Sequence, residues 1–563
     1  MHHKRIIECV PNFSEGRNPE IIRQITNEIE QVEGVTLLDI DPGKATNRTV
    51  VTFVGDPEHV IEAAFRAIVK AGELIDMSEH KGEHPRMGAT DVCPLIPIHG
   101  ITMEETAEFA RKLAERVGRE TDIPVYLYGY AQPKTERNDL SIIRAGEYEG
   151  FAEKIKLPEW APDFGAAIFN EKKGATVIGA RDFLIAYNVN LNTKSTRIAN
   201  RIAFDVREAG RVLRKGNPIS GEIVLDENGE PVRVPGKCKD VKAIGWYIEE
   251  YGIAQISANL TNYNVTPLHV FFDEVNQSAT SRGVRVTGSE LVGLVPLKAI
   301  LDAGRHFLKK QERSAGVSDA ELIEIAIKTL GLDELAPFDP QKKIIEYQMG
   351  SHAGKLIDMT CSAFADITAS ESTAPGGGSI AAYTGALGAA LETMVANVSA
   401  NKKGWEDRWE YFSDIAEKGQ VLKAELLRLV DEDTNAFAGI MEAFKLPKNN
   451  PEEITHRKAA IEAASLYATQ VPLQTMKVAH KILELAAEMI EKGNPNTLSD
   501  GAAGVLCNKT AVQAAYYNVM INAKGLSDKV IARQLADEAK SILDKNHAEA
   551  DMLLAKVEQG ISF

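Results

Sequence analysis

The feature that most constrains the fold is a change of sequence pattern after Leu332. Before it, short apolar runs typical of strands alternate with segments of helical period. From residue 356 to residue 563, nearly every segment is alanine-rich with helical period, and almost no strand signal occurs. A chain of 563 residues is also too long for one core. The sequence therefore predicts a multidomain protein with an α+β part and an all-α helical domain of six or more helices.

The α+β part shows a weak internal repeat. Residues 1–181 and 182–338 each read as strand, helix, strand, strand, helix, strand, and Asp56-Pro57 and Thr266-Pro267 occupy equivalent helix starts. This order predicts two tandem ferredoxin-like α+β subdomains, each with two helices on one face of a largely antiparallel sheet. Chance similarity of two α/β segments is the alternative. A linker is expected at 339–355, before the helical domain at 356–563.

Composition limits the classes of function. The net charge of −16 argues against a nucleic-acid partner. Five scattered cysteines without a Cys-x-x-Cys pair predict a reducing, cytoplasmic setting with no disulfide framework and no metal site. No run of eighteen apolar residues and no secretory signal pattern occurs, so no membrane association is expected.

A loop at 80–97 concentrates ionisable side chains between glycines and prolines. His84 precedes Pro85, which disfavours helical geometry at the histidine. An imidazole held on such a loop can act as a general acid or base near neutral pH. The alternative is a solvated surface loop with an idle histidine.

A run of glycines precedes an apolar helix in the helical part. The run is Gly376, Gly377 and Gly378, followed by Ser379, which is expected to cap the helix. Glycines here let an anionic ligand approach the free backbone N–H groups at the helix start. A flexible turn between helices is the alternative interpretation.

A second constellation in the helical part is a carboxylate on an apolar stripe. Asp433 shares a helix face with seven apolar residues between 426 and 444, whereas Asp431 and Glu432 point elsewhere. Lost solvation should raise the pKa of Asp433, which makes it a candidate general acid. The alternative is a buried aspartate satisfied by a local hydrogen bond.

Several stretches together resemble a known family, formiminotransferase-cyclodeaminase. They are ECVPNFSEG, GEHPRMGATDVCP, WAPDFG and ELVGLVPLKA in the first part, and APGGGSIAA, DEDTNAF and YYNVMIN in the helical part. The resemblance spans nearly the whole chain. Two stretches depart from the family pattern: a predicted hairpin at 222–235 is longer than in animal members, and the joint near residue 350 differs.

The resemblance implies two reactions. The first moves the formimino group from N-formimino-L-glutamate to N5 of tetrahydrofolate, a co-substrate expected in its polyglutamylated form. The second closes the ring to 5,10-methenyltetrahydrofolate and releases ammonia. The family pattern places catalytic roles on His84, Asp41 and Asp433, and it implies a homo-oligomer, an octameric ring. It places folate binding on the segment Gly165, Ala166, Ala167, Ile168, Phe169, Asn170, Glu171, Lys172, Lys173 and Gly174.

Two other functions fit the same sequence. In one, only the transferase is active and the helical domain is an assembly module. In the other, the chain is a folate-binding scaffold without turnover. Intact His84, Asp41 and Asp433 favour the bifunctional enzyme over both.

Overall fold

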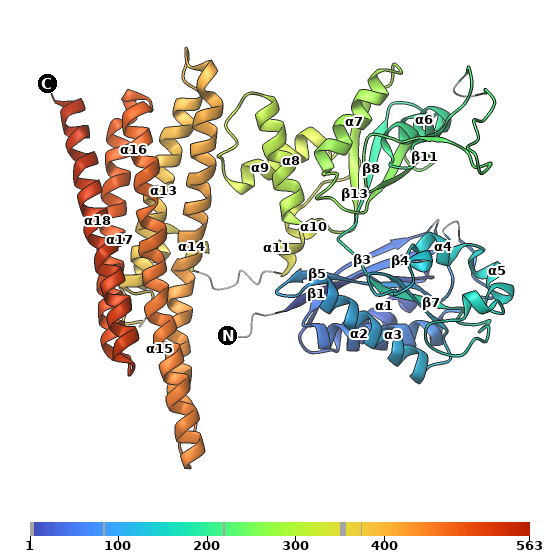
Figure 1. Ribbon diagram of the computed structural model, residues 1–563, viewed down its shortest axis with the longest axis horizontal. Coiled ribbons are helices and arrows are strands. Elements are labelled where there is room, and N and C mark those ends of the chain that lie inside the picture. Colours follow the sequence, from blue (N-terminus) through green and yellow to red (C-terminus); the bar gives the residue numbers. More distant parts are fainter. Residues whose placement is uncertain are drawn as a thin grey trace. The chain divides into compact units, whose positions relative to one another are not determined.

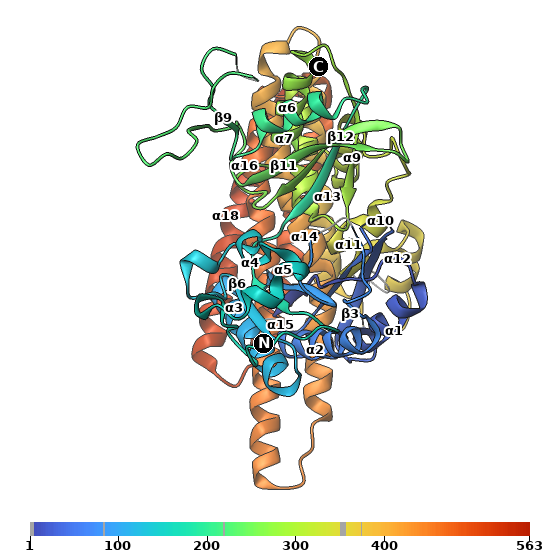
Figure 2. The same ribbon diagram turned by 90° about the vertical axis from the view of Figure 1, so that its right-hand side faces the viewer.

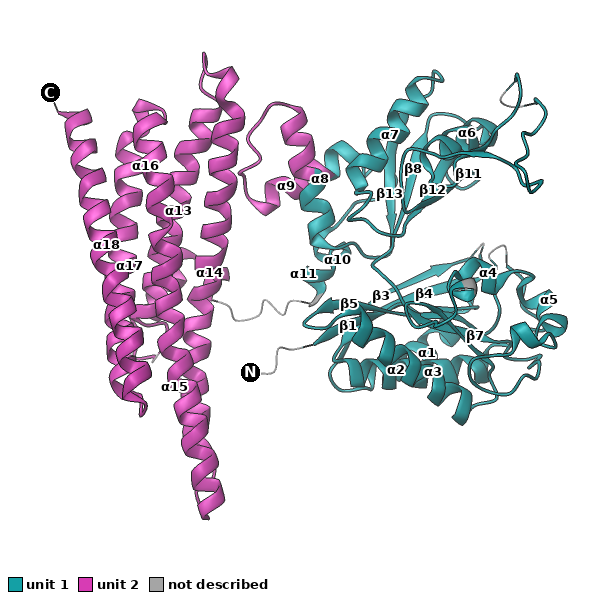
Figure 3. Cartoon of the chain, viewed as in Figure 1, with its two compact units in different colours: residues 1–303, 327–350 teal, residues 304–326, 351–563 magenta. Residues whose placement is uncertain are grey.

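The structure is a computed structural model that describes residues 5–44, 46–82, 85–217, 220–349, 356–372 and 374–562. The chain forms two compact units (Figure 3). Unit 1 contains Met1–Ala303 and Ile327–Gly350, and unit 2 contains Gly304–Ala326 and Ser351–Phe563. No helix among the described residues is long and apolar enough to cross a membrane.

The first sheet of unit 1 has seven strands. They are β1 (Ile6–Cys9), β2 (Asn12–Phe13), β3 (Val35–Gly43), β4 (Arg48–Gly55), β5 (Thr90–His99), β6 (Val125–Gly129) and β7 (Thr176–Ala180). The order is β1-β4-β2-β5-β7-β6, and β3 pairs with β4. Only β7 pairs in parallel, with β5 and β6, because the long helix α3 (Met103–Glu120) carries the chain back between β5 and β6.

Three helices cover one face of this sheet (Figure 1). They are α1 (Pro19–Glu30), α2 (Pro57–Leu74) and α3. Asn18, Asp56 and Thr102 cap them, since each side chain accepts hydrogen bonds from free N–H groups of the first turn. Strand residues of alternate register, such as Ile7 and Phe53, are buried against the helices. The intervening strand residues therefore face away from the helices.

The second sheet has four antiparallel strands in the order β11-β12-β8-β13. Its strands are β8 (Ile185–Leu191), β11 (Val241–Ile248), β12 (Ile253–Leu260) and β13 (Val286–Val292). Helices α6 (Thr196–Val206) and α7 (Leu268–Thr280) cover one face. Ser195 caps α6, but Thr266 does not cap α7: its hydroxyl donates to the Lys239 carbonyl at 2.7 Å.

Shorter elements complete unit 1. An arm at 209–236 contains β9 (Arg211–Val212) paired with β10 (Arg233–Val234). Within the predicted hairpin, the Gly229 N–H donates to the Asp226 carbonyl at 3.1 Å and closes a tight turn. Helices α4 (Leu140–Arg144) and α5 (Glu147–Lys154) follow β6. Helix α8 (Leu297–Lys310) follows β13, and its residues after Ala303 belong to unit 2. The segment expected to be a linker contains α10 (Pro340–Lys343) and α11 (Ile345–Met349), while its residues 350–355 lie outside the described residues.

Unit 2 is helical. Besides α9 (Asp319–Leu330), which belongs to this unit up to Ala326, its helices are α12 (Cys361–Thr368), α13 (Gly377–Ala400), α14 (Trp409–Lys445), α15 (Pro451–His480), α16 (Ile482–Lys492), α17 (Leu498–Gly525) and α18 (Lys529–Ile561). The described residues between 356 and 562 contain no strand. The alanine-rich helices α13, α14, α15 and α17 form the main core, because small side chains let their backbones approach closely.

The end of α14 and the start of α15 form a hairpin that extends past the neighbouring helices (Figure 2). Leu426, Leu429 and Val430 of the predicted stripe are buried. Phe437, Met441 and Phe444 are 38%, 46% and 51% exposed, so the prediction of a continuous buried stripe is wrong at its C-terminal end. Helical phase fixes which side chains share a face, but neighbouring helices decide how far along the helix that face is covered.

Candidate active sites

A cleft of about 510 Å³ lies between the uncovered faces of the two sheets in unit 1. Glu8, Arg48 and Val92 line it from the first sheet, and Asn188 and Asn259 line it from the second. These residues alternate along their strands with core residues. The cleft is therefore built from the strand positions that point away from the covering helices.

Ionisable side chains converge in this cleft. Asp41, one of the predicted site residues, lines it together with Glu8, Arg48, Arg144 and Arg181. The alternation of Ile7, Glu8 and Cys9 along a strand could have predicted that Glu8 faces away from the core. No comparable sequence pattern links the three arginines, because they come from separate segments. A cleft with three guanidinium groups favours an anionic ligand.

Glu8 is the buried carboxyl of the cleft. Its side chain is 1% exposed, and its Oε2 atom has no hydrogen-bond partner among the described residues. Burial raises the pKa of Glu8 to about 7, although the positive charge of Arg181 acts in the opposite direction. Glu8 can thus exchange a proton near neutral pH.

The loop that carries the predicted catalytic histidine is held at both ends. His84 itself and Glu83 lie outside the described residues. On one side, Asn47 donates from Nδ2 to the Lys81 carbonyl at 3.1 Å. On the other side, the buried Asp91 carboxylate accepts from the Met87 N–H at 3.1 Å and pairs with Arg144. These contacts link the loop to the residue before β4 and to an arginine of the cleft.

His80 of the same loop has a structural role. The Arg86 Nε donates to His80 Nδ1 at 3.2 Å, so the ring N–H is on Nε2 and donates to the Asn47 carbonyl at 2.9 Å. Burial lowers the pKa of His80, which keeps the ring neutral. Arg86 in turn binds Glu149. His80 is thus fully engaged and is not positioned as a free base.

The predicted folate segment 165–174 does not line the cleft. Its residue Asn170 donates to the Asp122 carboxylate at 2.8 Å, and the Lys172 carbonyl accepts from the Met77 N–H at 2.8 Å. Its last residue, Gly174, pairs with Gly88, four residues after His84. The segment is therefore joined to the loop of His84 rather than to the cleft wall.

In unit 2 the structure brings the two predicted constellations together. The Ser379 Oγ donates to Asp433 Oδ2 at 3.0 Å, and the Gly378 Cα faces the same carboxylate, where an added Cβ would overlap it. Burial raises the pKa of Asp433, and hydrogen bonds from Ser379 oppose the rise. This direction agrees with the expectation from helix phase. The glycines allow the helix start to approach the acid closely.

Two details differ from the sequence analysis. Gly376 is the residue that precedes the first turn of α13, and Ser379 lies within that turn, so the predicted cap by Ser379 is wrong. Its hydroxyl instead holds Asp433. Asp431 is not an idle surface group either, because its Oδ1 accepts from the Leu356 N–H at 2.8 Å.

Sequence reasoning also missed Asn518 of α17. A Cβ on Gly377 would lie 3.3 Å from the Asn518 Nδ2 atom, so this amide adjoins the helix start of α13. The YYNVMIN stretch offered a family match but no periodic signal for this role. Asn518 adds a hydrogen-bond donor and acceptor beside the glycines.

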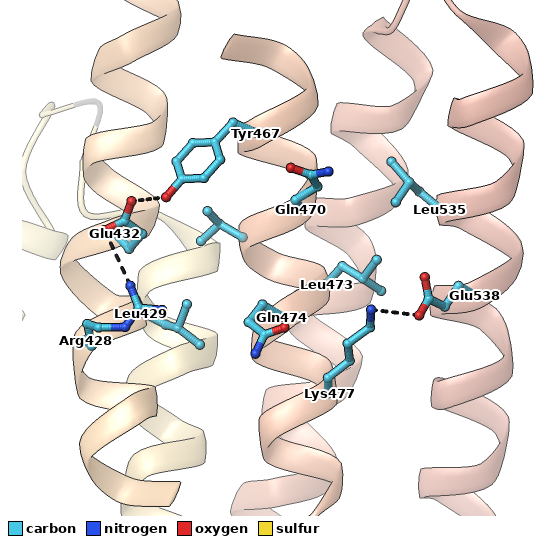
Figure 4. Close-up of a pocket in the computed structure, with 11 residues that line it drawn as sticks. Arg428, Leu429, Glu432, Tyr467, Gln470, Leu473, Gln474, Lys477, Leu535 and Glu538 are labelled. Carbon is cyan, nitrogen blue, oxygen red and sulfur yellow. Dashed lines mark hydrogen bonds and ion pairs between the residues drawn. The ribbon is translucent and has the colours of Figure 1, made fainter. Parts of the chain in front are cut away.

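A separate cavity of about 440 Å³ is lined by residues of α14, α15 and α18 (Figure 4). Glu432 lines it, accepting from the Tyr467 hydroxyl and lying 3.7 Å from Arg428, while Lys477 pairs with Glu538 at 2.8 Å. Asp433 is not among its lining residues. The described residues contain no group of three or more His, Cys, Asp or Glu side chains placed to hold a metal ion.

The described residues form two candidate sites. The α+β unit has a charged cleft, and the helical unit has a buried acid at a glycine-rich helix start. Three family models match in chain order: the N-terminal subdomain of the formiminotransferase domain at 6–181, the formiminotransferase domain at 186–350, and formiminotransferase-cyclodeaminase at 360–541.

Curated relatives match the whole chain and each part. Formimidoyltransferase-cyclodeaminase of Mus musculus is 42% identical over 98% of this chain and 99% of its own length. Glutamate formimidoyltransferase of Streptococcus pyogenes is 40% identical over 55% of this chain and 95% of its own. Methenyltetrahydrofolate cyclohydrolase of Methylorubrum extorquens is 37% identical over 36% of this chain and 95% of its own. The chain belongs to the formiminotransferase-cyclodeaminase family.

Proposed function

We propose that the chain is a bifunctional folate enzyme. Its α+β unit transfers the formimino group of N-formimino-L-glutamate to N5 of tetrahydrofolate. Its helical unit converts 5-formiminotetrahydrofolate to 5,10-methenyltetrahydrofolate and releases ammonia. The observation that carries the proposal is the full-length similarity to a formimidoyltransferase-cyclodeaminase, with single-activity relatives for each part.

The transfer step requires a base and then an acid. N5 of the folate attacks the amidine carbon and loses a proton, and the departing glutamate nitrogen gains one. His84 can perform both transfers, with the carboxylate of Asp41 orienting its ring. The cleft supports this assignment, since Asp41 lines it and the loop of His84 is tied to it through Asp91 and Arg144.

The cyclisation step requires an acid. N10 attacks the same carbon and loses its proton. The imino nitrogen of the formimino group gains two protons, one of them from the acid, and departs as ammonia. Asp433 is our candidate for that acid, because burial favours its protonated form and Ser379 fixes its orientation. Gly376, Gly377, Gly378 and Ser379 would bind the folate at the helix start.

Substrate binding in the transferase cleft is assigned to its cations and to the neighbouring segment. Arg48, Arg144 and Arg181 would bind the carboxylates of formiminoglutamate and of the folate tail, which we expect to be polyglutamylated. The segment 165–174 would contact folate beside the loop of His84. Neither step requires a metal.

We further propose the cellular and structural context. The reactions belong to histidine degradation and one-carbon metabolism in the cytoplasm, in a homo-oligomer such as an octameric ring, without nucleic acid or membrane partners. The functional divisions are 1–181, 182–338, a linker at 339–355, and 356–563. We classify both subdomains as ferredoxin-like, and the strand order β11-β12-β8-β13 supports this for the second.

One assay tests the function. Pure protein is mixed with tetrahydrofolate and formiminoglutamate, and methenyl absorbance and ammonia are followed together. Both should rise in equal amounts. Accumulation of 5-formiminotetrahydrofolate would support the alternative in which only the transferase is active and the helical domain is an assembly module. Absence of turnover would support the folate-binding scaffold. Hydrolysis of added methenyltetrahydrofolate without ammonia production would instead favour the cyclohydrolase activity named for one relative.

A further inference from the structure

A second polar pocket in unit 1 is lined almost wholly by arginines. It encloses about 510 Å³ between α6, the arm at 209–236 and the residues after α7. Seven of its ten lining residues are arginines: Arg197, Arg201, Arg207, Arg211, Arg214, Arg233 and Arg282. The chain has a net charge of −16, so this pocket has the opposite sign of charge to the protein as a whole.

Few carboxylates neutralise these arginines. Asp205 pairs with both Arg211 and Arg282. The other five arginines form no ion pair with any residue in the described part of the chain. The pocket therefore holds a large excess of positive charge when no ligand is present.

The protein positions several of these guanidinium groups without neutralising them. Arg214 donates to the Gly221 carbonyl at 2.8 Å, and Arg207 donates from Nε to the Gly210 carbonyl at 3.0 Å. Arg207 also stacks over Phe204, with its Cζ 4.3 Å from the ring centre. Backbone carbonyls and one aromatic ring thus orient these guanidinium groups, whose other N–H groups can bind a ligand.

The guanidinium groups in this pocket repel one another. The pKa of Arg207 is lowered by burial and by the charge of Arg233, and the pKa of Arg211 is lowered by burial, Arg282 and Arg201. Like charges held together destabilise the free pocket, so an anion that entered would remove this repulsion as well as gain hydrogen bonds.

The pocket is separate from the candidate transferase cleft. Helix α6 covers the face of the second sheet that packs around Tyr187 and Ile256, whereas the cleft uses Asn188 and Ser257 on the opposite face. No residue lines both pockets. A ligand here would not compete directly for the cleft.

We propose that this arginine pocket binds a small molecule that carries two or more phosphate groups. Planar guanidinium forks match phosphate oxygens, and adjacent phosphates concentrate several negative charges in a short length. Five unneutralised arginines in about 510 Å³ match such a charge density. A chain of glutamates carries one charge per residue, so its charges are spread over a greater length than those of adjacent phosphates. The proposal does not depend on the proposed function.

The test measures binding of inorganic tripolyphosphate to the full-length protein by calorimetry at about 0.15 M salt, where exposed charges are screened. The variant Arg201→Gln/Arg233→Gln removes two arginines that pair with no described carboxylate. It should bind tripolyphosphate at least about tenfold more weakly, since hydrogen bonds to charged groups are the strong ones. Arg285→Gln, an exposed arginine of the same subdomain outside the pocket, is the matched control and should bind normally.

The transferase rate and melting temperature of each variant, measured without tripolyphosphate, report whether it folds. If the double variant does not fold, Arg197→Gln at an exposed helix position replaces it. Absence of binding to the unmodified protein, or equal binding by the variants, would overturn the site. Tighter binding of tetra-γ-glutamate than of tripolyphosphate would overturn the phosphate assignment.

Discussion

The cleft of unit 1 and the Asp433 cluster of unit 2 differ in how many side chains and segments form them. The cleft gathers carboxylates and arginines from strands and loops far apart in the chain. The Asp433 cluster uses two helices, one serine and a glycine that permits close approach. A site that must bind charged substrates and move protons twice needs many groups. A site that donates one proton needs a single well-placed acid.

The same physical effect acts on one acid in each region. Burial raises the pKa of both Glu8 and Asp433. In the cleft the charge of Arg181 opposes the rise, whereas at Asp433 the opposing effect comes from hydrogen bonds of Ser379. The pKa of an acid in the charged cleft thus depends on burial and on the charges of other residues. In the helical core it depends on burial and on hydrogen bonds from one neighbour.

The largest expected effect is on transfer. His84→Ala should reduce the transferase rate to the detection limit, because we propose that the imidazole acts as base and then as acid. Cyclisation of added 5-formiminotetrahydrofolate should remain nearly intact. Separate assays of the two steps measure this. A folded variant that loses both steps would show that the two regions do not work as separate sites.

Asp433→Asn should lower cyclisation by roughly two to four orders of magnitude, the usual range for a general acid. Asparagine keeps the shape and can still accept from Ser379, so fold and transfer should persist. Asp414→Asn, an exposed aspartate of the same helix, is the control and should change little. Asp431→Asn should also change little, since its amide oxygen can still accept from Leu356 N–H. A comparable loss in either control would remove the special role of position 433.

Gly378→Ala should impair cyclisation by displacing the acid. An added Cβ would overlap the Asp433 carboxylate, so the side chain or the helix must shift. A misplaced catalytic group costs up to about a hundredfold in rate. Gly439→Ala, at a helical position with open space around it, is the control. Rates of ring closure for the two variants compare them, and an unimpaired Gly378→Ala enzyme would contradict the geometry.

Ser379→Ala should have a smaller effect that depends on pH. The Ser379 hydroxyl lowers the pKa of Asp433, so its removal should raise that pKa further. If Asp433 acts in its protonated form, cyclisation falls as pH rises through its pKa, and this fall should move to higher pH in the variant. The pH profile of cyclisation measures the shift. A profile that moves to lower pH would contradict the acid role.

Glu8→Gln should change stability with pH. The folded pKa of about 7 is above the ordinary value of 4.5, so between these values the native protein binds more protons than the unfolded chain. Its free energy of unfolding therefore falls as pH rises from about 4.5 to 7. Glutamine removes this loss, which is on the order of 3 kcal/mol. Denaturant titrations at pH 5 and pH 8 should show that the variant's advantage appears only at pH 8.

Local sequence signals predicted most of the elements. Asn18, Asp56 and Thr102 cap helices as their positions indicate, because capping depends on a few adjacent residues. Ser379 shows the limit of such reasoning. Its type and place fit a cap, yet a carboxylate 54 residues away competes for its hydroxyl, and only packing reveals that partner.

The sequence by itself determined the division into an α+β part and a helical part, since hydrophobic period is a local property. It also determined the raised pKa of Asp433, because helix phase alone places that carboxyl on the buried face. Tertiary structure decided which distant groups share the cleft, where the helical stripe is covered, and that seven arginines meet in one pocket. These depend on contacts between segments far apart in the chain, and such contacts leave no periodic trace in the sequence.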